Sequence, residues 1–161
     1  MIKRLLLILS LVFLVSFSLN AQDVKQPAVA LIPYPVTLVE GEGAFVFTEK
    51  TVVSLEDKEM EAIARDFIGL FTKAAGFTPK LKVNSKKGDV RLMKDDSLQE
   101  EEYALEVTSE KILMRAAGVK GAFYALQTLR QLLPSAIESN ECKLDVVWEV
   151  PAIRVIDEPR F

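Results

Sequence analysis

The sequence predicts an α+β domain in which one mixed β-sheet carries two amphipathic helices on one face. Two stretches repeat apolar residues at the i, i+3, i+4, i+7 spacing of a helix. Several short stretches rich in β-branched and aromatic residues lie around them, bounded by glycine, proline or polar turns. Subtracting a 21-residue leader from the 161 residues leaves 140, the size of one domain with a single core.

Residues 1–21 have the layout of a secretory signal peptide. A short basic start is followed by Leu5–Leu19, which is almost continuously apolar, and Ala21 is the expected last residue removed. The apolar run is shorter than the roughly 20 residues that a spanning helix needs, and an uncleaved N-terminal anchor is the alternative. We therefore expect export to the periplasm, cell surface or medium, with residues 22–30 as a flexible lead.

Composition excludes several classes of function. Without the leader the chain has 18 basic and 23 acidic residues, a net charge of −5, which does not attract nucleic acid or anionic lipid. The absence of histidine excludes Ser-His and Cys-His nucleophiles and the zinc site of zincin metalloproteases. Cys142 is the single cysteine, so no internal disulfide forms, and we expect a partly buried structural thiol rather than a reactive one.

The domain is expected to begin with an extended segment and three strands. Leu31–Val36 contains two prolines, which favour extended backbone. Residues 36–39 and 44–48 have strand-like alternation, and Glu40-Gly41-Glu42-Gly43 supplies the glycines of a turn between them. Residues 51–55 form the third strand.

The clearest helix is expected over residues 57–75. Its apolar residues share one face: Met60, Ile63, Ala64, Phe67, Leu70, Phe71 and Ala74. Ser54 and Asp57 offer capping oxygens at its start, and Gly76 is a suitable stop at its end.

Four further strands are expected after this helix. Residues 80–83 and 89–93 are separated by a turn that contains Gly88. An acidic loop follows, and residues 103–107 and 111–115 then form a hairpin.

A second helix is expected over residues 118–133, ended by Pro134. Its apolar face consists of Ala122, Ala125, Leu126, Leu129, Leu132 and Leu133. A polar loop then leads to two closing strands at residues 144–148 and 153–156.

Three short motifs invite a chemical interpretation, and each has a simpler structural one. Gly41-Glu42-Gly43 lacks the third glycine and the following helix of a phosphate loop, so a hairpin turn is preferred. Gly118 and Gly121 could bind an anion at a helix N-terminus, but close approach of strand and helix is preferred. Glu100-Glu101-Glu102 could attract a cation, but a solvated loop is preferred.

Two further groups of residues could contribute to a site. The adjacent carboxylates Asp157 and Glu158 could divide acid and base roles, although no other candidate catalytic residue is near them in sequence, so a structural role is preferred. Polar residues on the second helix could contact a ligand or a neighbouring domain, and contact with a domain is only slightly preferred over simple exposure to solvent: Tyr124, Gln127, Thr128 and Gln131.

Three stretches carry a family resemblance. Leu31-Ile32-Pro33-Tyr34-Pro35, followed by Gly43-Ala44-Phe45, is a proline-rich opening that leads to a glycine and an aromatic residue. Gly121–Leu133 combines Gly, Tyr, Gln-Thr-Leu and Gln-Leu along one helix. Ile153–Phe161 ends in Pro-Arg-Phe. Together these stretches resemble the N-terminal part of the family 20 glycoside hydrolases, the β-N-acetylhexosaminidases.

The resemblance implies a zincin-like, noncatalytic α+β domain over residues 31–150, with residues 151–161 leading into a (β/α)8 catalytic barrel in the same polypeptide, at whose start this chain stops. The barrel would remove terminal β-linked N-acetylglucosamine or N-acetylgalactosamine from glycans by substrate-assisted, retaining hydrolysis. The resemblance implies no metal or organic cofactor. The family's catalytic Asp-Glu pair lies deep in the barrel, so its role does not transfer to Asp157-Glu158, and Arg160 does not match the family's sugar-binding arginine. No catalytic, cofactor-binding or metal-binding residue is expected in this chain.

A free-standing exported glycan-binding or scaffold module is the alternative to an enzyme domain. Rings suitable for sugar stacking are scattered in sequence, which argues weakly against it: Tyr34, Tyr103, Tyr124 and Trp148. If nothing followed the chain, Ile153, Ile156 and Phe161 should form an exposed apolar patch.

Overall fold

A computed structural model describes residues 29–158 of the chain. The predicted signal peptide, most of the predicted flexible lead and Phe161 lie outside the described residues. Within that range, no helix has the length and apolar character needed to cross a membrane.

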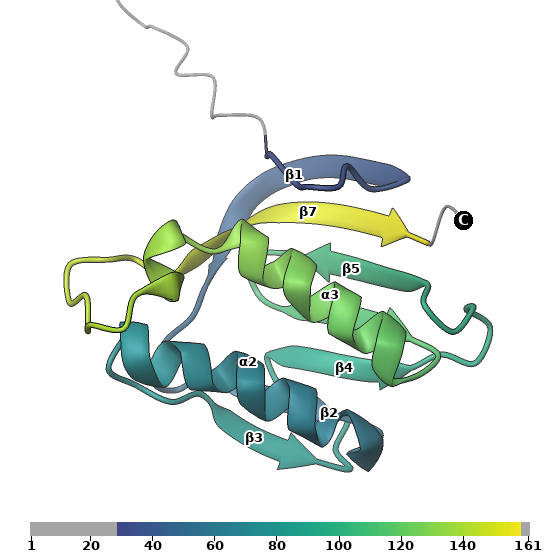
Figure 1. Cartoon of the computed structure of the whole chain (residues 1–161), viewed down its shortest axis with the longest axis horizontal. Helices are drawn as coiled ribbons and strands as arrows, with labels where there is room; N and C mark the ends of the chain where they lie inside the picture. Colours follow the sequence, from purple (N-terminus) through teal and green to yellow (C-terminus); the bar gives the residue numbers. More distant parts are fainter. Residues whose placement is uncertain (1–28, 159–161) are drawn as a thin grey trace, which may run out of the picture.

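The core of the fold is one mixed seven-stranded sheet with the strand order β1-β7-β5-β6-β4-β2-β3 (Figure 1). Antiparallel pairing joins β1, β7, β5 and β6, and parallel pairing joins β6, β4, β2 and β3. The strands are β1 (Thr37–Val46), β2 (Val52–Leu55), β3 (Lys80–Val83), β4 (Val90–Lys94), β5 (Tyr103–Val107), β6 (Ile112–Ala116) and β7 (Glu149–Asp157).

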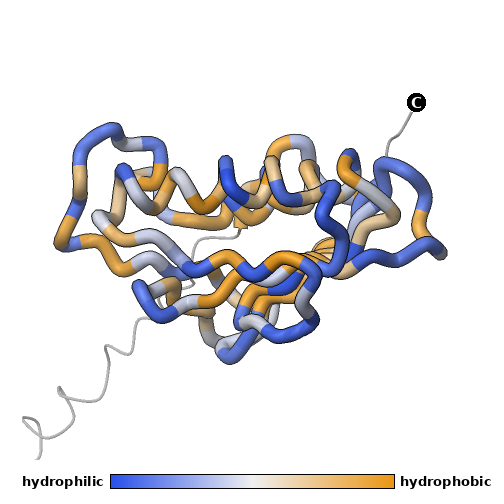
Figure 2. Tube along the Cα trace, turned by 90° about the horizontal axis from the view of Figure 1, so that it is seen from below, coloured by the Kyte–Doolittle hydropathy of each residue, from blue (hydrophilic) through white to orange (hydrophobic). Residues whose placement is uncertain are grey.

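Both long helices cover the same face of this sheet, as Figure 1 shows, and the view from below in Figure 2 separates the two layers. The helical elements are η1 (Lys58–Met60), α2 (Glu61–Ala74), α3 (Val119–Leu132) and η2 (Ser135–Glu138). The predicted α+β class, with two amphipathic helices on one face, is therefore confirmed.

A cluster of aromatic rings lies in the core between the helices and the sheet, where β1 ends and β7 begins. The ring of Phe71 on α2 lies 4.6 Å from that of Phe47 and 6.1 Å from that of Trp148, measured between centroids. Phe45 and Phe67 each meet Phe47 edge to face. Such pairs add to the hydrophobic stabilisation that burial of the rings already provides.

Two predicted strands at the N-terminus are in fact one. β1 runs through Glu40-Gly41-Glu42-Gly43 and pairs with β7 on both sides of it, with a register shift between Glu40 and Ala44. The predicted hairpin turn is thus wrong, because the glycines allow a bulge in a continuous strand. Gly43 has a φ of +88°, and a Cβ on Gly41 would lie 3.3 Å from the Cβ of Ala152.

The predicted strand over residues 144–148 is also wrong. Residues 139–148 form a loop in which Leu144 is 90% exposed, and only Trp148 is buried. Its β-branched and aromatic residues favour a strand, but ladder pairing with β1 begins only at Glu149, opposite Val46.

β7 is interior to the sheet, since it pairs with β1 on one side and β5 on the other. It therefore keeps residues 151–157 in the same sheet as the rest of the domain. Ile153 is only 2% exposed and Ile156 is half-buried, which corrects the expectation that both would be exposed if nothing followed the chain.

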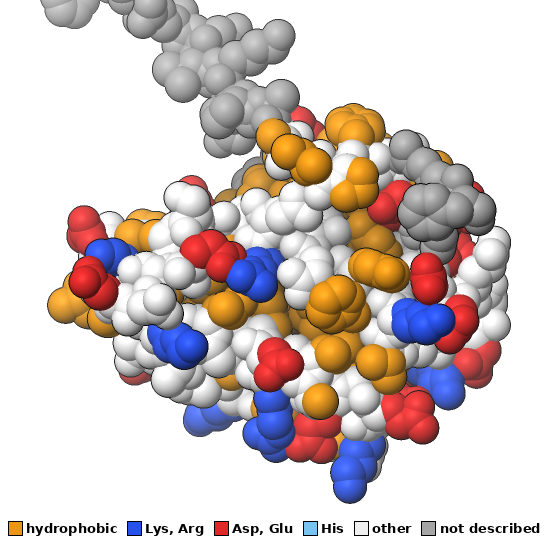
Figure 3. Space-filling model, viewed as in Figure 1, with side chains coloured by type: hydrophobic (Ala, Val, Ile, Leu, Met, Phe, Trp, Pro, Cys, Tyr) orange, Lys and Arg blue, Asp and Glu red, His pale blue; other side chains and the backbone are white. Residues whose placement is uncertain are grey.

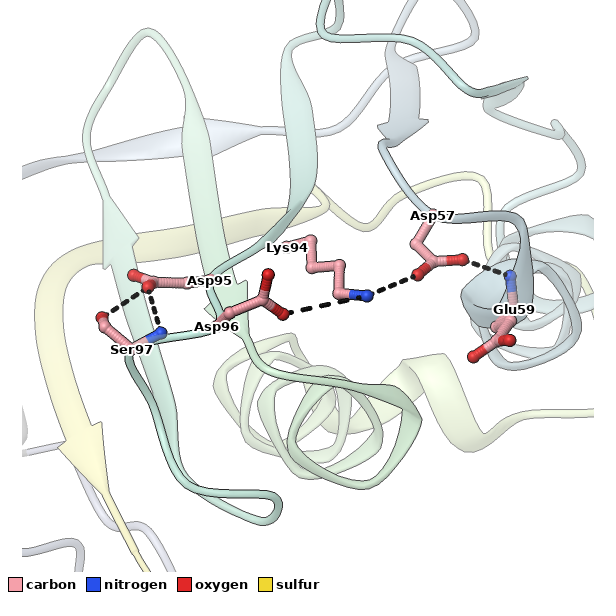
Figure 4. A network of polar contacts seen from close by, with 6 residues as sticks. All are labelled: Asp57, Glu59, Lys94, Asp95, Asp96 and Ser97. Carbon is pink, nitrogen blue, oxygen red and sulfur yellow. Dashed lines mark hydrogen bonds and ion pairs between the residues drawn. The ribbon is translucent and has the colours of Figure 1, made fainter.

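The predicted first helix starts with the 3-10 turn η1, and one of the two predicted residues caps this turn; α2 itself follows Met60, which makes no side-chain cap hydrogen bond. The Asp57 carboxylate accepts a hydrogen bond from the Glu59 backbone amide at 2.9 Å, and Lys94 bridges Asp57 and Asp96 at 3.5 and 3.8 Å (Figure 4). Ser54 is not a cap: its hydroxyl is buried in the sheet, 2.7 Å from where a Cβ on Gly88 would lie. At the other end Gly76, with φ +72°, is confirmed as the stop.

Candidate functional site

A groove runs along α3 on the helix side of the domain and encloses about 440 Å³. One wall is α3, the other is the extended segment before β1, and the end of β7 closes it. We call it the α3 groove, and its lining consists of Leu31–Pro35, Glu101, Tyr103, Phe123, Tyr124, Gln127, Thr128, Gln131, Asp157 and Glu158.

The floor of the α3 groove is a buried pair of hydroxyl groups. The Tyr103 hydroxyl on β5 lies 2.7 Å from the Thr128 hydroxyl on α3. Burial raises the pKa of Tyr103 to about 12; the hydrogen bond with Thr128 lowers it and the charge of Asp157 raises it further. Tyr103 is therefore neutral at physiological pH and ties the sheet to the helix.

Two polar side chains hold the extended segment in place. The Ile32 backbone amide donates to Gln131 Oε1 at 3.0 Å, and the Val36 backbone amide donates to Asp157 Oδ1 at 3.1 Å. All four polar helix residues that were predicted to contact a ligand or another domain line the α3 groove. Of these, Thr128 and Gln131 have partners within the domain, while Tyr124 remains 42% exposed to solvent.

The rim of the α3 groove is acidic. Glu101, Asp157 and Glu158 all line it, and among the described lining residues there is no lysine or arginine. Asp157 has a structural role, because its carboxylate accepts the hydrogen bond from Val36 and its backbone lies opposite Tyr103 in the sheet. The geometry thus favours the structural interpretation of the Asp157-Glu158 pair.

Hydrophobic side chains gather on the surface around this groove, as Figure 3 shows over the helix layer. Phe123 is 43% exposed, and its ring meets that of Tyr124 edge to face at 5.7 Å. Ile32 and Tyr34 across the groove are more exposed still. The sequence signal for this surface is an aromatic pair, Phe123 and Tyr124, on the polar side of the second helix. Tyr124 was identified from the sequence, whereas Phe123 was missed.

A smaller hollow of about 160 Å³ lies between the two helices. We call it the interhelix hollow, and it is lined by Ile63, Asp66, Phe67, Leu70, Phe123, Leu126, Gln127 and Arg130. Phe123 and Gln127 belong to both hollows, so Phe123 forms a ridge between two adjoining depressions.

The acidic loop before β5 is held by ion pairs and hydrogen bonds. Lys120 Nζ lies 3.1 Å from Glu100 and 3.4 Å from Glu101, and these contacts raise the pKa of Lys120. Glu102 accepts the Gln99 backbone amide at 2.9 Å. Across the part of the chain that the structure describes, no group of three or more acidic or cysteine side chains could hold a metal ion.

The two glycines at the start of α3 behave differently. A Cβ on Gly121 would lie 2.4 Å from the carbonyl oxygen of Glu102 and 3.2 Å from Ala116, which confirms the predicted close approach of strand and helix there. Gly118 has open space around it and is the N-cap of the helix, so the same explanation is wrong for that residue.

Two other candidates lie away from the groove. Trp148 is buried in the aromatic cluster, so only three of the four rings considered for sugar stacking line the α3 groove. Cys142 is exposed, which corrects the expectation of a partly buried thiol: it lies in the loop before β7, and its sulfur occupies the space beside Gly76.

The opposite face of the sheet carries a third hollow, of about 240 Å³. Met93 and Leu113 line it together with the charged side chains Glu106, Arg115 and Arg154. Its mixed charges and smaller size distinguish it from the apolar, acid-rimmed α3 groove.

Comparison with known proteins decides the family. Residues 28–158 match the family model described as glycosyl hydrolase family 20, domain 2. The chain belongs to glycosyl hydrolase family 20. Its described residues form the noncatalytic α+β domain that the resemblance implied.

Relatives of this family 20 domain agree with the assignment. The chain is 29% identical over 160 residues to a beta-hexosaminidase of Porphyromonas gingivalis, covering 94% of this chain but 20% of the relative. It is 29% identical over 141 residues to a beta-N-acetylhexosaminidase of Cellulomonas fimi, covering 84% of this chain and 27% of the relative. The chain thus spans only a fifth to about a quarter of these proteins.

A solved structure supports the fold of the family 20 domain. The N-acetyl-beta-hexosaminidase of Streptomyces plicatus, in complex with Thio-NAglucal, superposes with a TM-score of 0.73 at 26% identity. The match covers 79% of this chain and 26% of that one.

Proposed function

We propose that this chain is the N-terminal domain of an exported β-N-acetylhexosaminidase. The whole enzyme would remove terminal β-linked N-acetylglucosamine or N-acetylgalactosamine from glycans. The observation that carries the proposal is the family 20 match over residues 28–158, in a chain that covers 20% and 27% of two relatives named as hexosaminidases. The signal-peptide layout of residues 1–21 supports export.

In this proposal the chemistry belongs to a (β/α)8 barrel in the same polypeptide. The substrate's acetamido carbonyl attacks the anomeric carbon, a glutamic acid of the barrel protonates the leaving oxygen, and the neighbouring aspartate orients the acetamido group. This is the substrate-assisted exception among retaining glycosidases. Asp157 and Glu158 take no part, because Asp157 already accepts the Val36 amide at the end of β7. The 161-residue chain alone is therefore inactive.

The proposal is tested first by sequencing the coding DNA past the codon of Phe161. An open frame that continues into a barrel with a later Asp-Glu pair is expected. A stop codon directly after Phe161 would contradict the proposed enzyme.

The second test is hydrolysis of a chromogenic β-N-acetylglucosaminide by purified protein. The longer polypeptide should release the chromophore, and a variant with its barrel Asp-Glu pair changed to Asn-Gln should not. Release by the 161-residue chain would contradict the proposed division of labour.

A glycan-binding module is the second candidate, and one observation favours it. Tyr34, Tyr103 and Tyr124 line one groove together with carboxylates and amides, the groups that stack on and hydrogen-bond to sugars. Tyr103 is only 4% exposed, however, which leaves two rings available for stacking. Retention of the 161-residue chain on an N-acetylglucosamine polymer, lost in Tyr124→Ala, would support this candidate over the enzyme domain.

A further inference from the structure

We propose that two copies of this chain associate through the open face of the sheet, with Arg154 of each copy paired to Glu106 of the partner subunit. The open face is the one that α2 and α3 leave uncovered, and it carries the hollow of about 240 Å³ that both residues line. The inference concerns assembly rather than catalysis, so it does not rest on the proposed function.

Apolar side chains lie on this open face beside the charged ones. Val39 on β1 and Ile156 on β7 alternate with side chains that pack into the core, so both point to the open face. Val39 is 56% exposed. Ala104 of β5 and Leu113 of β6 line the hollow on the same face. Apolar surface that a domain leaves uncovered is typical of an interface with another protein.

The charged residues that line the hollow are complementary to one another. Arg115 already has a partner, since it lies 3.9 Å from the carboxylate of Asp95. Arg154 and Glu106 lie opposite each other on β7 and β5, but within the part of the chain that the structure describes neither forms an ion pair. One positive and one negative charge are thus available here, which suits a second copy of the same surface better than a highly charged ligand.

The strand register shows how two such faces fit together. Arg154 and Glu106 are at the same level of neighbouring strands. A two-fold axis parallel to β5 and β7, and midway between them, places β7 of each copy over β5 of the partner, so each Arg154 lies over the partner's Glu106. An axis moved onto β5 or onto β7 would instead set two glutamates or two arginines against each other. Charge therefore selects the axis between the strands.

The same axis brings apolar side chains together on either side of the charged pairs. Ile156 is opposite Ala104 in the register, so each Ile156 lies over the partner's Ala104. Val39 on β1 and Leu113 on β6 are level with the charged pair, so each Val39 lies over the partner's Leu113. Sheets that pack face to face keep their strands nearly aligned about 10 Å apart, as this arrangement requires.

Sedimentation velocity of the 161-residue chain tests the inference, and wild type should approach twice the monomer mass as its concentration rises. Arg154→Glu and Glu106→Arg should each raise the dissociation constant of the dimer by roughly 100-fold or more, because two like-charge contacts replace two ion pairs. An equimolar mixture of these two variants should regain the dimer, since one copy then supplies two arginines and the other two glutamates. A monomeric wild type, or a mixture that stays monomeric, would overturn the inference.

Matched substitutions separate association from folding. Lys82→Glu reverses a charge on β3, which extends beyond the partner's β1, and should leave the dimer unchanged. If Arg154→Glu or Glu106→Arg unfolds the chain, Val39→Glu is compared with Val46→Glu. Both valines are exposed on β1, but Val46 is level with Glu149, beyond the start of β6, and has no strand opposite it. Only Val39→Glu should weaken the dimer, and equal effects would contradict the proposed axis.

The longer polypeptide is measured in the same way, because another part of the same chain could cover the open face instead. It should also form a dimer that Arg154→Glu dissociates. A monomeric longer polypeptide would overturn the inference, whereas its hydrolysis of the chromogenic substrate tests the proposed function separately. Hydrolysis by a monomer would keep the enzyme and remove the dimer, and a dimer without hydrolysis would do the reverse.

Discussion

The hydrogen bond between Tyr103 and Thr128 is the residue-level contact that fixes the floor of the α3 groove. The two hydroxyl groups are 2.7 Å apart, and both side chains are buried between β5 and α3. A buried hydroxyl without a partner loses its hydrogen bonds to water and gains none in return. Each of these two hydroxyl groups therefore depends on the other for its hydrogen bond in the folded protein.

We expect Tyr103→Phe to lower the free energy of unfolding by about 1–3 kcal/mol, because it leaves the Thr128 hydroxyl buried without its partner. Urea denaturation measures the loss. Thr128→Val should cost a similar amount, and the double variant should cost less than the sum of the two. Additive losses would show that the hydroxyl groups do not stabilise the fold as a pair.

A second readout of Tyr103→Phe is the dependence of stability on pH. The folded pKa of Tyr103 is raised from 10.0 to about 12, so the unfolded chain releases this proton first as the pH rises. The stability contributed by the neutral phenol is complete below pH 10 and is lost between pH 10 and 12. Wild type should therefore lose more stability than Tyr103→Phe across that interval, and parallel curves would contradict the assignment.

At the scale of elements, the sequence best predicted those helices and strands whose limits depend on residues close together in the chain. The ranges of β3 and β5 were predicted as observed, and α2 and α3 differ from their predictions mainly at the ends, because apolar periodicity and Gly76 act within a few residues. The bulge in β1 was missed because two glycines beside glutamates suit a turn and a bulge equally. Only the partner strand β7, over a hundred residues later, decides between them.

The residues of the α3 groove were likewise predictable only in part. Gln127 and Gln131 were found because they lie off the apolar face of a recognisable helix. Their meeting with Ile32 and Asp157 depends on how distant strands pair, which a single sequence does not specify.

The two glycines inside helices should respond to alanine with opposite signs. A Cβ on Gly69 of α2 would meet nothing within 4 Å, so Gly69→Ala should raise the free energy of unfolding by about 0.5–1 kcal/mol through helix propensity alone. Gly121→Ala in α3 should lower it by about 1–3 kcal/mol, because the new Cβ would lie 2.4 Å from the Glu102 carbonyl oxygen and force the backbones apart. Chemical denaturation of both variants checks the pair, and a stabilising Gly121→Ala would disprove the close packing of α3 on the end of the acidic loop.

At the scale of the whole molecule, β7 determines where the folding unit ends. It is the strand through which β1 joins the rest of the sheet, since β1 pairs only with β7 among the described strands. Its inward side chains, Val150, Ile153 and Val155, are at most 2% exposed and lie in the main core. A division of the chain at residue 150 would separate these side chains from the sheet they complete.

We therefore expect a chain cut after Val150 to lose cooperative unfolding, whereas a chain cut after Glu158 keeps it. Removing Ile153 and Val155 alone costs about 1.5–3 kcal/mol for each buried side chain, a large part of the 5–15 kcal/mol that stabilises a typical domain. The cut also frees both edges that β7 occupied, which exposes unpaired backbone groups on β1 and β5. Thermal unfolding followed by circular dichroism distinguishes the two chains, with a chain cut after Val107 as the unfolded control. A sharp transition in the chain cut after Val150 would mean that the domain is complete without β7, and that residues 151–158 belong to the following domain.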